Sequence, residues 1–215
     1  MNKVCTKRDY TLGEEIFSAV SHGVGAALSV VALVTMVVRA VLSQNIYAVV
    51  SAAIFGASLI ILYTMSTLYH ALTPKRAKKV FRIFDHATIF LLIAGTYTPY
   101  LLVSLHGKTG WILFFILWGL CAIGIVFDSV MLEKFRKIEM LLYVGMGWCI
   151  LFASSSLIAS LERGGLVLLF TGGVLYTVGI IFYAMKKIPY MHSIWHLFVL
   201  AGSVFHYFSV YLYVL

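Results

Sequence analysis

Charged residues, prolines and cysteines are all scarce in this sequence. Asp, Glu, Lys and Arg make up 11% of the 215 residues, while 62% are hydrophobic. An average soluble domain has about 25% charged residues, so this composition excludes a soluble globular domain. The apolar runs are long enough for membrane-spanning helices rather than for the strands of a barrel. With 3 prolines in the whole chain, we expect a compact, all-α, polytopic membrane protein.

The small number of cysteines excludes two further kinds of structure. Cys5 lies near the N-terminus, Cys121 and Cys149 lie in apolar runs, and no CxxC pair is present. We therefore infer neither a disulfide framework nor a thiolate metal site. The first apolar run is long and has no convincing cleavage site, so we interpret it as a retained first span and not as a signal peptide.

Long apolar runs are what the sequence does contain, and they predict a seven-transmembrane-helix bundle. Each run has roughly 20 residues or more, enough to cross a hydrocarbon core of about 30 Å. The runs cover roughly residues 16–42, 46–71, 80–105, 111–132, 138–160, 166–185 and 191–215. We expect residues 1–13 to form a short cytoplasmic tail and residues 14–215 to form a single domain. Pro99 lies inside the third run and is expected to kink its helix.

The basic residues indicate how the bundle is oriented. If the N-terminal tail shares a side with the loops after spans two, four and six, that side holds 13 of the 16 Lys and Arg residues. The other three are Arg39, Lys108 and Arg163. Positively charged loops stay in the cytoplasm. We therefore expect a multi-pass protein of the bacterial plasma membrane, with its N-terminus cytoplasmic and its C-terminus outside.

The formal charge of +8 also bears on the partners of the protein. The basic residues fall in short loops, and no separate basic domain is present. We therefore predict contacts with anionic lipid headgroups and no binding of nucleic acid.

The last span opens with the segment HSIWH, in which His192 and His196 are four residues apart. This spacing places both imidazoles on one face of a helix, where they can share one metal ion. Because they follow Lys187 by five and nine residues, they lie roughly 7–14 Å from the cytoplasmic loop. Ionisable groups at such a position in a membrane are costly and are functional by default.

Three more polar residues are predicted to lie in the same layer. Span two ends in STLYH, where Ser66 and His70 are again four residues apart, and Asp85 lies near the start of span three. Three imidazoles suit a zinc ion that keeps its fourth position open, although iron and copper also accept imidazole. A carboxylate and a hydroxyl beside them can orient or deprotonate water. The alternative is that these are unrelated polar residues satisfied inside the bundle.

Other polar residues in the apolar runs have more ordinary interpretations. His206 lies roughly 15 Å deeper than the paired histidines and is expected to be a packed polar residue. His22 is expected to make structural hydrogen bonds, and Asp128 to face the boundary between water and lipid. His86 is interpreted either as a support for the site or as a residue that faces headgroups. His106, in an outer turn, is expected to be solvated.

Several segments of the chain resemble the haemolysin III family and its wider relatives, the progestin and adipoQ receptors. These segments are EEIFSAVSHGVG, STLYH, FRIFDH, AGTYTP and HSIWHLFVLAGSVFHYF. The resemblance covers essentially the whole chain and implies a zinc site. On this basis His70, His192 and His196 would be the ligands, with Asp85 and Ser66 beside the metal.

The pattern and the resemblance together leave three functions open. The first is a zinc-dependent hydrolase of a membrane lipid amide or ester, similar to the ceramidases, in which Asp85 is the general base and Ser66 stabilises an oxyanion. The second is a pore-forming or cytolytic activity, which the family name implies. The third is a sensor without catalysis, in which zinc ties spans two and seven together.

Overall fold

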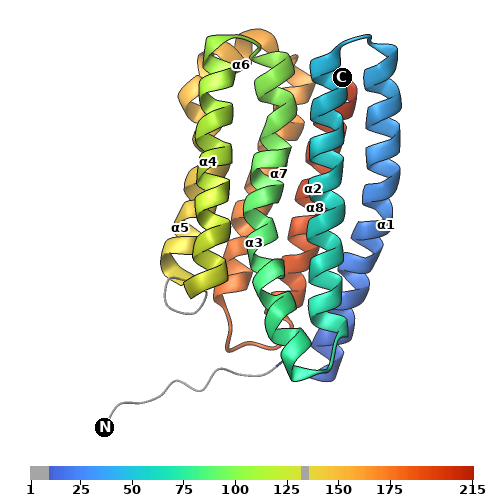
Figure 1. Cartoon of the computed structure of the whole chain (residues 1–215), viewed down its shortest axis with the longest axis vertical. Coiled ribbons are helices and arrows are strands. Elements are labelled where there is room, and N and C mark those ends of the chain that lie inside the picture. The colour runs from blue at the N-terminus through green and yellow to red at the C-terminus, as the bar shows by residue number, and fades with distance from the viewer. Residues whose placement is uncertain (1–9, 132–135) are drawn as a thin grey trace.

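The structure is a computed structural model that describes residues 10–131 and 136–215. Most of the predicted cytoplasmic tail and part of the basic loop after the fourth span lie outside these residues. The described residues form an antiparallel bundle of helices (Figure 1), namely α1 (Leu12–Leu42), α2 (Ile46–Ala71), α3 (Lys75–Pro99), η1 (Tyr100–Ser104), α4 (Lys108–Met131), α5 (Arg136–Gly147), η2 (Cys149–Ala153), α6 (Ser154–Ser160), α7 (Arg163–Ala184) and α8 (Met191–Tyr213).

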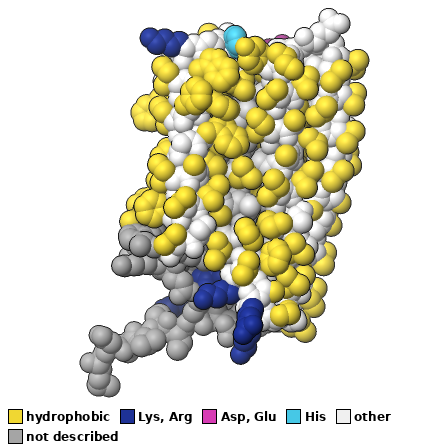
Figure 2. Space-filling view, viewed as in Figure 1, with side chains coloured by type: hydrophobic (Ala, Val, Ile, Leu, Met, Phe, Trp, Pro, Cys, Tyr) yellow, Lys and Arg dark blue, Asp and Glu magenta, His cyan; other side chains and the backbone are white. Residues whose placement is uncertain are grey.

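The bundle confirms the predicted fold class of an all-α, polytopic membrane protein. Within the described part of the chain, 7 helical segments are long and apolar enough to cross a membrane. Hydrophobic side chains cover the flank of the bundle in Figure 2, while most of the Lys and Arg side chains in view lie at its lower end. Because α1 begins at this lower end and the C-terminus lies at the upper end (Figure 1), the number of spans is odd, as expected.

The start of α1 is tied to the loop before α8. Thr11 and Glu14 form a capping box, with the Thr11 side chain accepting from the Glu14 amide and the Glu14 side chain accepting from the Thr11 amide. The same Glu14 side chain also accepts a hydrogen bond of 2.7 Å from the backbone N–H of Tyr190. One turn further along α1, the hydroxyls of Ser18 and Ser193 lie 3.0 Å apart. These contacts hold the first turns of α8 against α1.

The third span is longer than the sequence pattern predicts. The helix begins at Lys75, so the basic residues interpreted as a loop form its first turns instead. Pro99 does not end the span. It lacks the backbone N–H that an α-helix needs, and from Tyr100 to Ser104 the backbone continues as a π-helix.

The fifth span is broken, where the sequence predicts one continuous helix over roughly 138–160. The α-helix stops at Gly147, and a short 3₁₀ segment and α6 complete the crossing. The Tyr97 hydroxyl donates to the Gly147 carbonyl at 2.6 Å and accepts from the Ile150 N–H at 3.2 Å. Non-helical backbone is tolerated in a membrane only where such partners satisfy it. Tyr97 therefore stabilises the break from the neighbouring helix.

The Tyr97→Phe variant should lower the stability of the fold. It leaves a backbone carbonyl and a backbone N–H without their partner, and each such loss costs about 1–3 kcal/mol. Thermal unfolding of the purified protein in detergent, followed by tryptophan fluorescence, should show a lower Tm. The control is Tyr47→Phe, because the Tyr47 ring is 38% exposed and contacts aromatic neighbours through its ring. Equal Tm values for the two variants would contradict the role of Tyr97.

Candidate metal centre

His70, His192 and His196 come together between the end of α2 and the first turns of α8. The Nε2 atoms of His70 and His192 are 3.3 Å apart, and those of His192 and His196 are 3.1 Å apart. One ligand atom from each residue lies within 4.8 Å of the others. His70 and His196 are buried, and His192 is partly buried. The predicted set of three histidines therefore forms one buried group that could hold a metal ion.

The spacing of these nitrogens fits a metal ion. In a tetrahedral zinc site with Zn–N distances of about 2.0–2.1 Å, neighbouring ligand nitrogens are about 3.3–3.4 Å apart. The two measured Nε2–Nε2 distances, 3.3 and 3.1 Å, are close to this value. Imidazole also suits copper and iron. The geometry thus defines a possible metal site, and the choice of zinc depends on the chemistry of the ligands.

Glu15 orients His70 from the neighbouring helix α1. The Nδ1 of His70 lies 2.7 Å from one carboxylate oxygen of Glu15, and Lys78 donates to the other oxygen at 2.7 Å. A carboxylate on the far nitrogen fixes the tautomer of a ligating histidine and makes it a stronger ligand. The sequence pattern alone did not identify Glu15 as part of the site. Its position near the cytoplasmic end of the first span, in the layer of the histidines, was the signal that could have identified it.

Aromatic rings stack against two of the three histidines. Tyr10 stacks on His192 with a centroid distance of 4.8 Å, and His22 stacks on His196 with a centroid distance of 3.7 Å. The prediction that His22 makes structural hydrogen bonds is wrong for the described residues, because neither of its buried ring nitrogens has a hydrogen-bond partner there. His22 instead fixes the plane of the His196 ring by contact.

Ser66 and Asp85 are both buried, but in different surroundings. Ser66 lies one turn before His70 on α2, and its hydroxyl has no hydrogen-bond partner among the described residues. Asp85 lies on the wall of an internal cavity that His22 also lines. The Lys78–Glu15 ion pair brings α3 and α1 to one level. Asp85 follows Lys78 by seven residues on α3, and His22 follows Glu15 by seven residues on α1. Both therefore lie about 10 Å deeper in the bundle than the Lys78–Glu15 ion pair.

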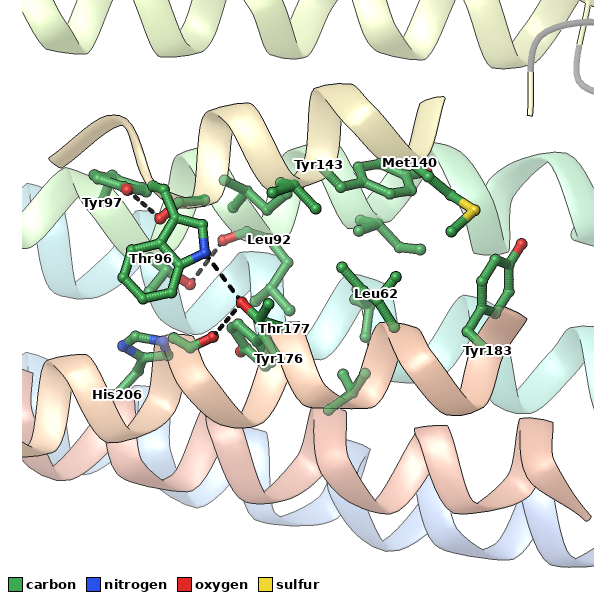
Figure 3. A pocket seen from close by; sticks show the side chains of 18 of the residues that line it. Leu62, Leu92, Thr96, Tyr97, Met140, Tyr143, Tyr176, Thr177, Tyr183 and His206 are labelled. Atoms are coloured by element: carbon green, nitrogen blue, oxygen red, sulfur yellow. Dashed lines mark hydrogen bonds between the residues drawn. The ribbon is translucent and has the colours of Figure 1, made fainter. Parts of the chain in front are cut away.

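The cavity lies beside the candidate metal centre and extends deeper into the bundle. Its walls come mainly from α3, α5, α7 and α8, and most of the lining side chains are apolar. In Figure 3, Met140 and Tyr183 lie toward one end and His206 toward the other. The Tyr183 ring is 5.9 Å from the ring of His192, so this end of the cavity adjoins the three histidines.

Asp128 lies elsewhere than predicted, and the structure excludes one of the two interpretations of His86. Asp128 is 3% exposed, so the expectation that it faces the boundary between water and lipid is wrong. His86 contacts Glu139 at 2.7 Å in the interior, and therefore does not face headgroups. Both residues lie on the side of the bundle formed by α3, α4 and α5. His206 is buried in the bundle, which agrees with a packed polar residue.

The fold and the site define the class: an integral membrane protein with seven membrane-spanning helices and a buried group of three histidines at one end of the bundle. A family model described as "Haemolysin-III related" matches residues 10–207. The chain belongs to the haemolysin III family and is a multi-pass protein of the cell membrane.

Two bacterial relatives match almost the whole chain. "Hemolysin-3" of Bacillus cereus is 43% identical over 215 residues, which cover 100% of this chain and 98% of the relative. "Hemolysin-3 homolog" of Bacillus subtilis (strain 168) is 46% identical over 204 residues, which cover 95% of this chain and 96% of the relative.

A human protein is a more distant relative. Human "Monocyte to macrophage differentiation factor" is 29% identical over 179 residues, or 80% of this chain and 74% of the relative. The similarity thus extends beyond bacteria.

Replacing a histidine of the centre should remove bound metal. We expect His192→Ala and His196→Ala to lose most of the metal that the purified wild type retains, because two imidazoles cannot complete a site that needs at least three protein ligands. Elemental analysis by mass spectrometry gives both the identity and the stoichiometry of the metal. His106→Ala is the control, since His106 lies in the turn beyond the opposite end of α3. A wild type without metal, or variants that keep it fully, would contradict the site.

Removing the Glu15 carboxylate should weaken metal binding without abolishing it. We expect Glu15→Ala to reduce metal affinity about 10- to 100-fold, the usual effect of losing a carboxylate behind a histidine ligand. Glu15→Gln should fall in between, because its amide oxygen can still accept from His70. Competition with a chromophoric chelator measures the affinity, and Glu162→Ala in an outer loop is the control. Unchanged affinity in Glu15→Ala would contradict the orienting role.

Proposed function

We propose that this protein is a zinc-dependent hydrolase of a membrane lipid amide or ester. The observation that carries the proposal is a group of three histidines beside a mostly apolar cavity, whose wall residues His22 and Tyr183 contact His196 and His192. Three neutral imidazoles with a carboxylate behind one of them are a ligand set that suits zinc. The cavity offers an apolar environment for a lipid chain whose polar head reaches the metal centre.

Each residue of the proposed site would have a separate role in the reaction. When bound, zinc polarises a carbonyl group and makes water a stronger nucleophile near neutral pH. His70, His192 and His196 would hold the ion, and Glu15 would keep the His70 ring in place. Asp85, on the wall of the cavity, would take the proton of the attacking water and pass it to the leaving nitrogen or oxygen. The Ser66 hydroxyl would donate a hydrogen bond to the oxyanion that forms on the substrate.

The Asp85→Asn variant separates catalysis from metal binding. We expect it to retain zinc and to lose turnover by about 10²–10⁴-fold, the usual contribution of a general acid–base group. Release of fatty acid from ceramide, phospholipid and acylglycerol substrates, measured by mass spectrometry, reports the turnover. Asp128→Asn is the matched control, because Asp128 is a buried carboxylate outside the cavity lining. Full turnover in Asp85→Asn would overturn the mechanism.

A cytolytic activity is the second candidate, because two bacterial relatives carry the name Hemolysin-3. Liposomes loaded with calcein and mixed with the purified protein distinguish the two functions. Leakage that persists in His70→Ala, without any lipid product, would favour lysis over hydrolysis. Zinc that raises the Tm while no lipid is cleaved would favour the sensor instead. Lipid product that depends on His70 supports the hydrolase.

A further inference from the structure

The end of the cavity farther from the candidate metal centre carries a histidine that the proposed mechanism does not use. His206 lines the cavity and is 5% exposed. Its Nδ1 is buried and has no hydrogen-bond partner within the described part of the chain. An unsatisfied imidazole is costly in the interior of a membrane protein, where water is scarce. This position therefore calls for a partner that enters through the cavity.

Three of the polar groups near His206 already bond to other residues. The Tyr176 hydroxyl lies 2.8 Å from the Ser203 hydroxyl, and the Thr177 hydroxyl accepts from the Trp148 indole at 3.0 Å. The Tyr97 hydroxyl bonds to the break in the fifth span. Figure 3 shows Tyr97, Tyr176 and Thr177 toward the same end of the cavity as His206. The His206 imidazole and the Tyr100 hydroxyl both line the cavity, and within the described part of the chain both have an unused capacity for hydrogen bonding.

The ring of His206 is held in place by its neighbours. A Cβ atom at Gly172 would come within 2.7 Å of the His206 Nε2, so glycine at this position allows the ring to lie against the backbone of α7. The Tyr176 ring, also on α7, packs against the His206 ring with a centroid distance of 5.1 Å. A ring with a fixed orientation can select a ligand by the position of its polar group.

The spacing along α8 sets the distance to the metal centre. His206 follows His196 by ten residues, which corresponds to about 15 Å along the helix axis. An extended chain advances about 3.5 Å for every three bonds, so about a dozen bonds cover this distance. Most of the side chains that line the cavity are apolar.

We infer that the cavity binds an acyl chain with a second hydrogen-bonding group, such as a hydroxyl, about a dozen bonds from its head, and that His206 recognises this group. The inference rests on the proposed function, because the head of the chain is placed at the metal centre. It names the subset of lipids that the site prefers: acyl chains hydroxylated near the middle. The recognised hydroxyl and the His206 imidazole form one hydrogen bond, with no covalent step.

Binding of three free fatty acids to the purified, metal-loaded protein tests the inference. Competition against a fluorescent fatty acid in detergent compares octadecanoic acid with 12-hydroxyoctadecanoic acid and 2-hydroxyoctadecanoic acid. We expect the 12-hydroxy acid to bind about five- to tenfold more tightly than octadecanoic acid, which corresponds to one net hydrogen bond. The 2-hydroxy acid carries its hydroxyl beside the head and should show no such gain through His206.

Two variants connect the preference to the residue. His206→Phe should reduce the affinity ratio to about one, while His206→Gln, which keeps a hydrogen-bonding group, should retain part of it. Metal content equal to that of the wild type shows that each variant is folded. The inference is overturned if the wild type binds all three acids equally, if it binds none of them, or if His206→Phe keeps the ratio.

The outcome is also separable from that of the proposed function. A preference for the 12-hydroxy acid in a protein that cleaves no lipid would defeat the hydrolase and leave the recognition by His206 standing. Lipid turnover without a preference for the 12-hydroxy acid would support the hydrolase and overturn the recognition by His206.

Discussion

The contact between the Glu15 carboxylate and the Nδ1 of His70 joins helices whose positions decide where the metal centre lies. Lys78 binds the second oxygen of the same carboxylate, so α1, α2 and α3 meet at one residue. The adjacent Glu14 accepts from the backbone of Tyr190 and thereby holds the start of α8. Two neighbouring acidic residues thus place His70 opposite His192 and His196. Without these two residues, α2, α3 and the start of α8 would lose the contacts that fix their position along α1.

An unpaired polar group inside a membrane protein is energetically unfavourable. The buried polar residues of this bundle include some that bond to the helix backbone and some that have no partner. Most hydroxyls satisfy themselves on the helix backbone, as Thr88 and Thr96 do one turn back along α3. Ser66, His22 and His206 do not. They lie beside the metal centre or on the cavity, where a ligand can complete their hydrogen bonds. Ser51 and Asp128 also have an unpartnered side-chain oxygen among the described residues, but neither lines the cavity.

The broken fifth span shows how the cavity is built. A continuous helix would satisfy its own backbone, but here Gly147, Trp148 and Ile150 form part of the cavity wall instead. The cost of the break is reduced by Tyr97, which binds backbone groups on both sides of it. The Trp148 indole donates to Thr177 on α7 and links the break to the sixth span. The cavity thus depends on side chains from α3 and α7 that replace lost helical hydrogen bonds.

The sequence by itself determined the class of fold and the three histidines. The length of the apolar runs is set by the thickness of the membrane, and helical spacing with loop charge places polar residues by depth. Depth is a one-dimensional measure, so it cannot tell which face of a helix meets which neighbour. That is why Glu15 was not identified as part of the site, while His22 was expected to make a hydrogen bond and Asp128 to face the membrane boundary. Only the tertiary structure, which fixes the rotation of each helix about its axis, brought Glu15 to His70 and opened a cavity beside the metal centre.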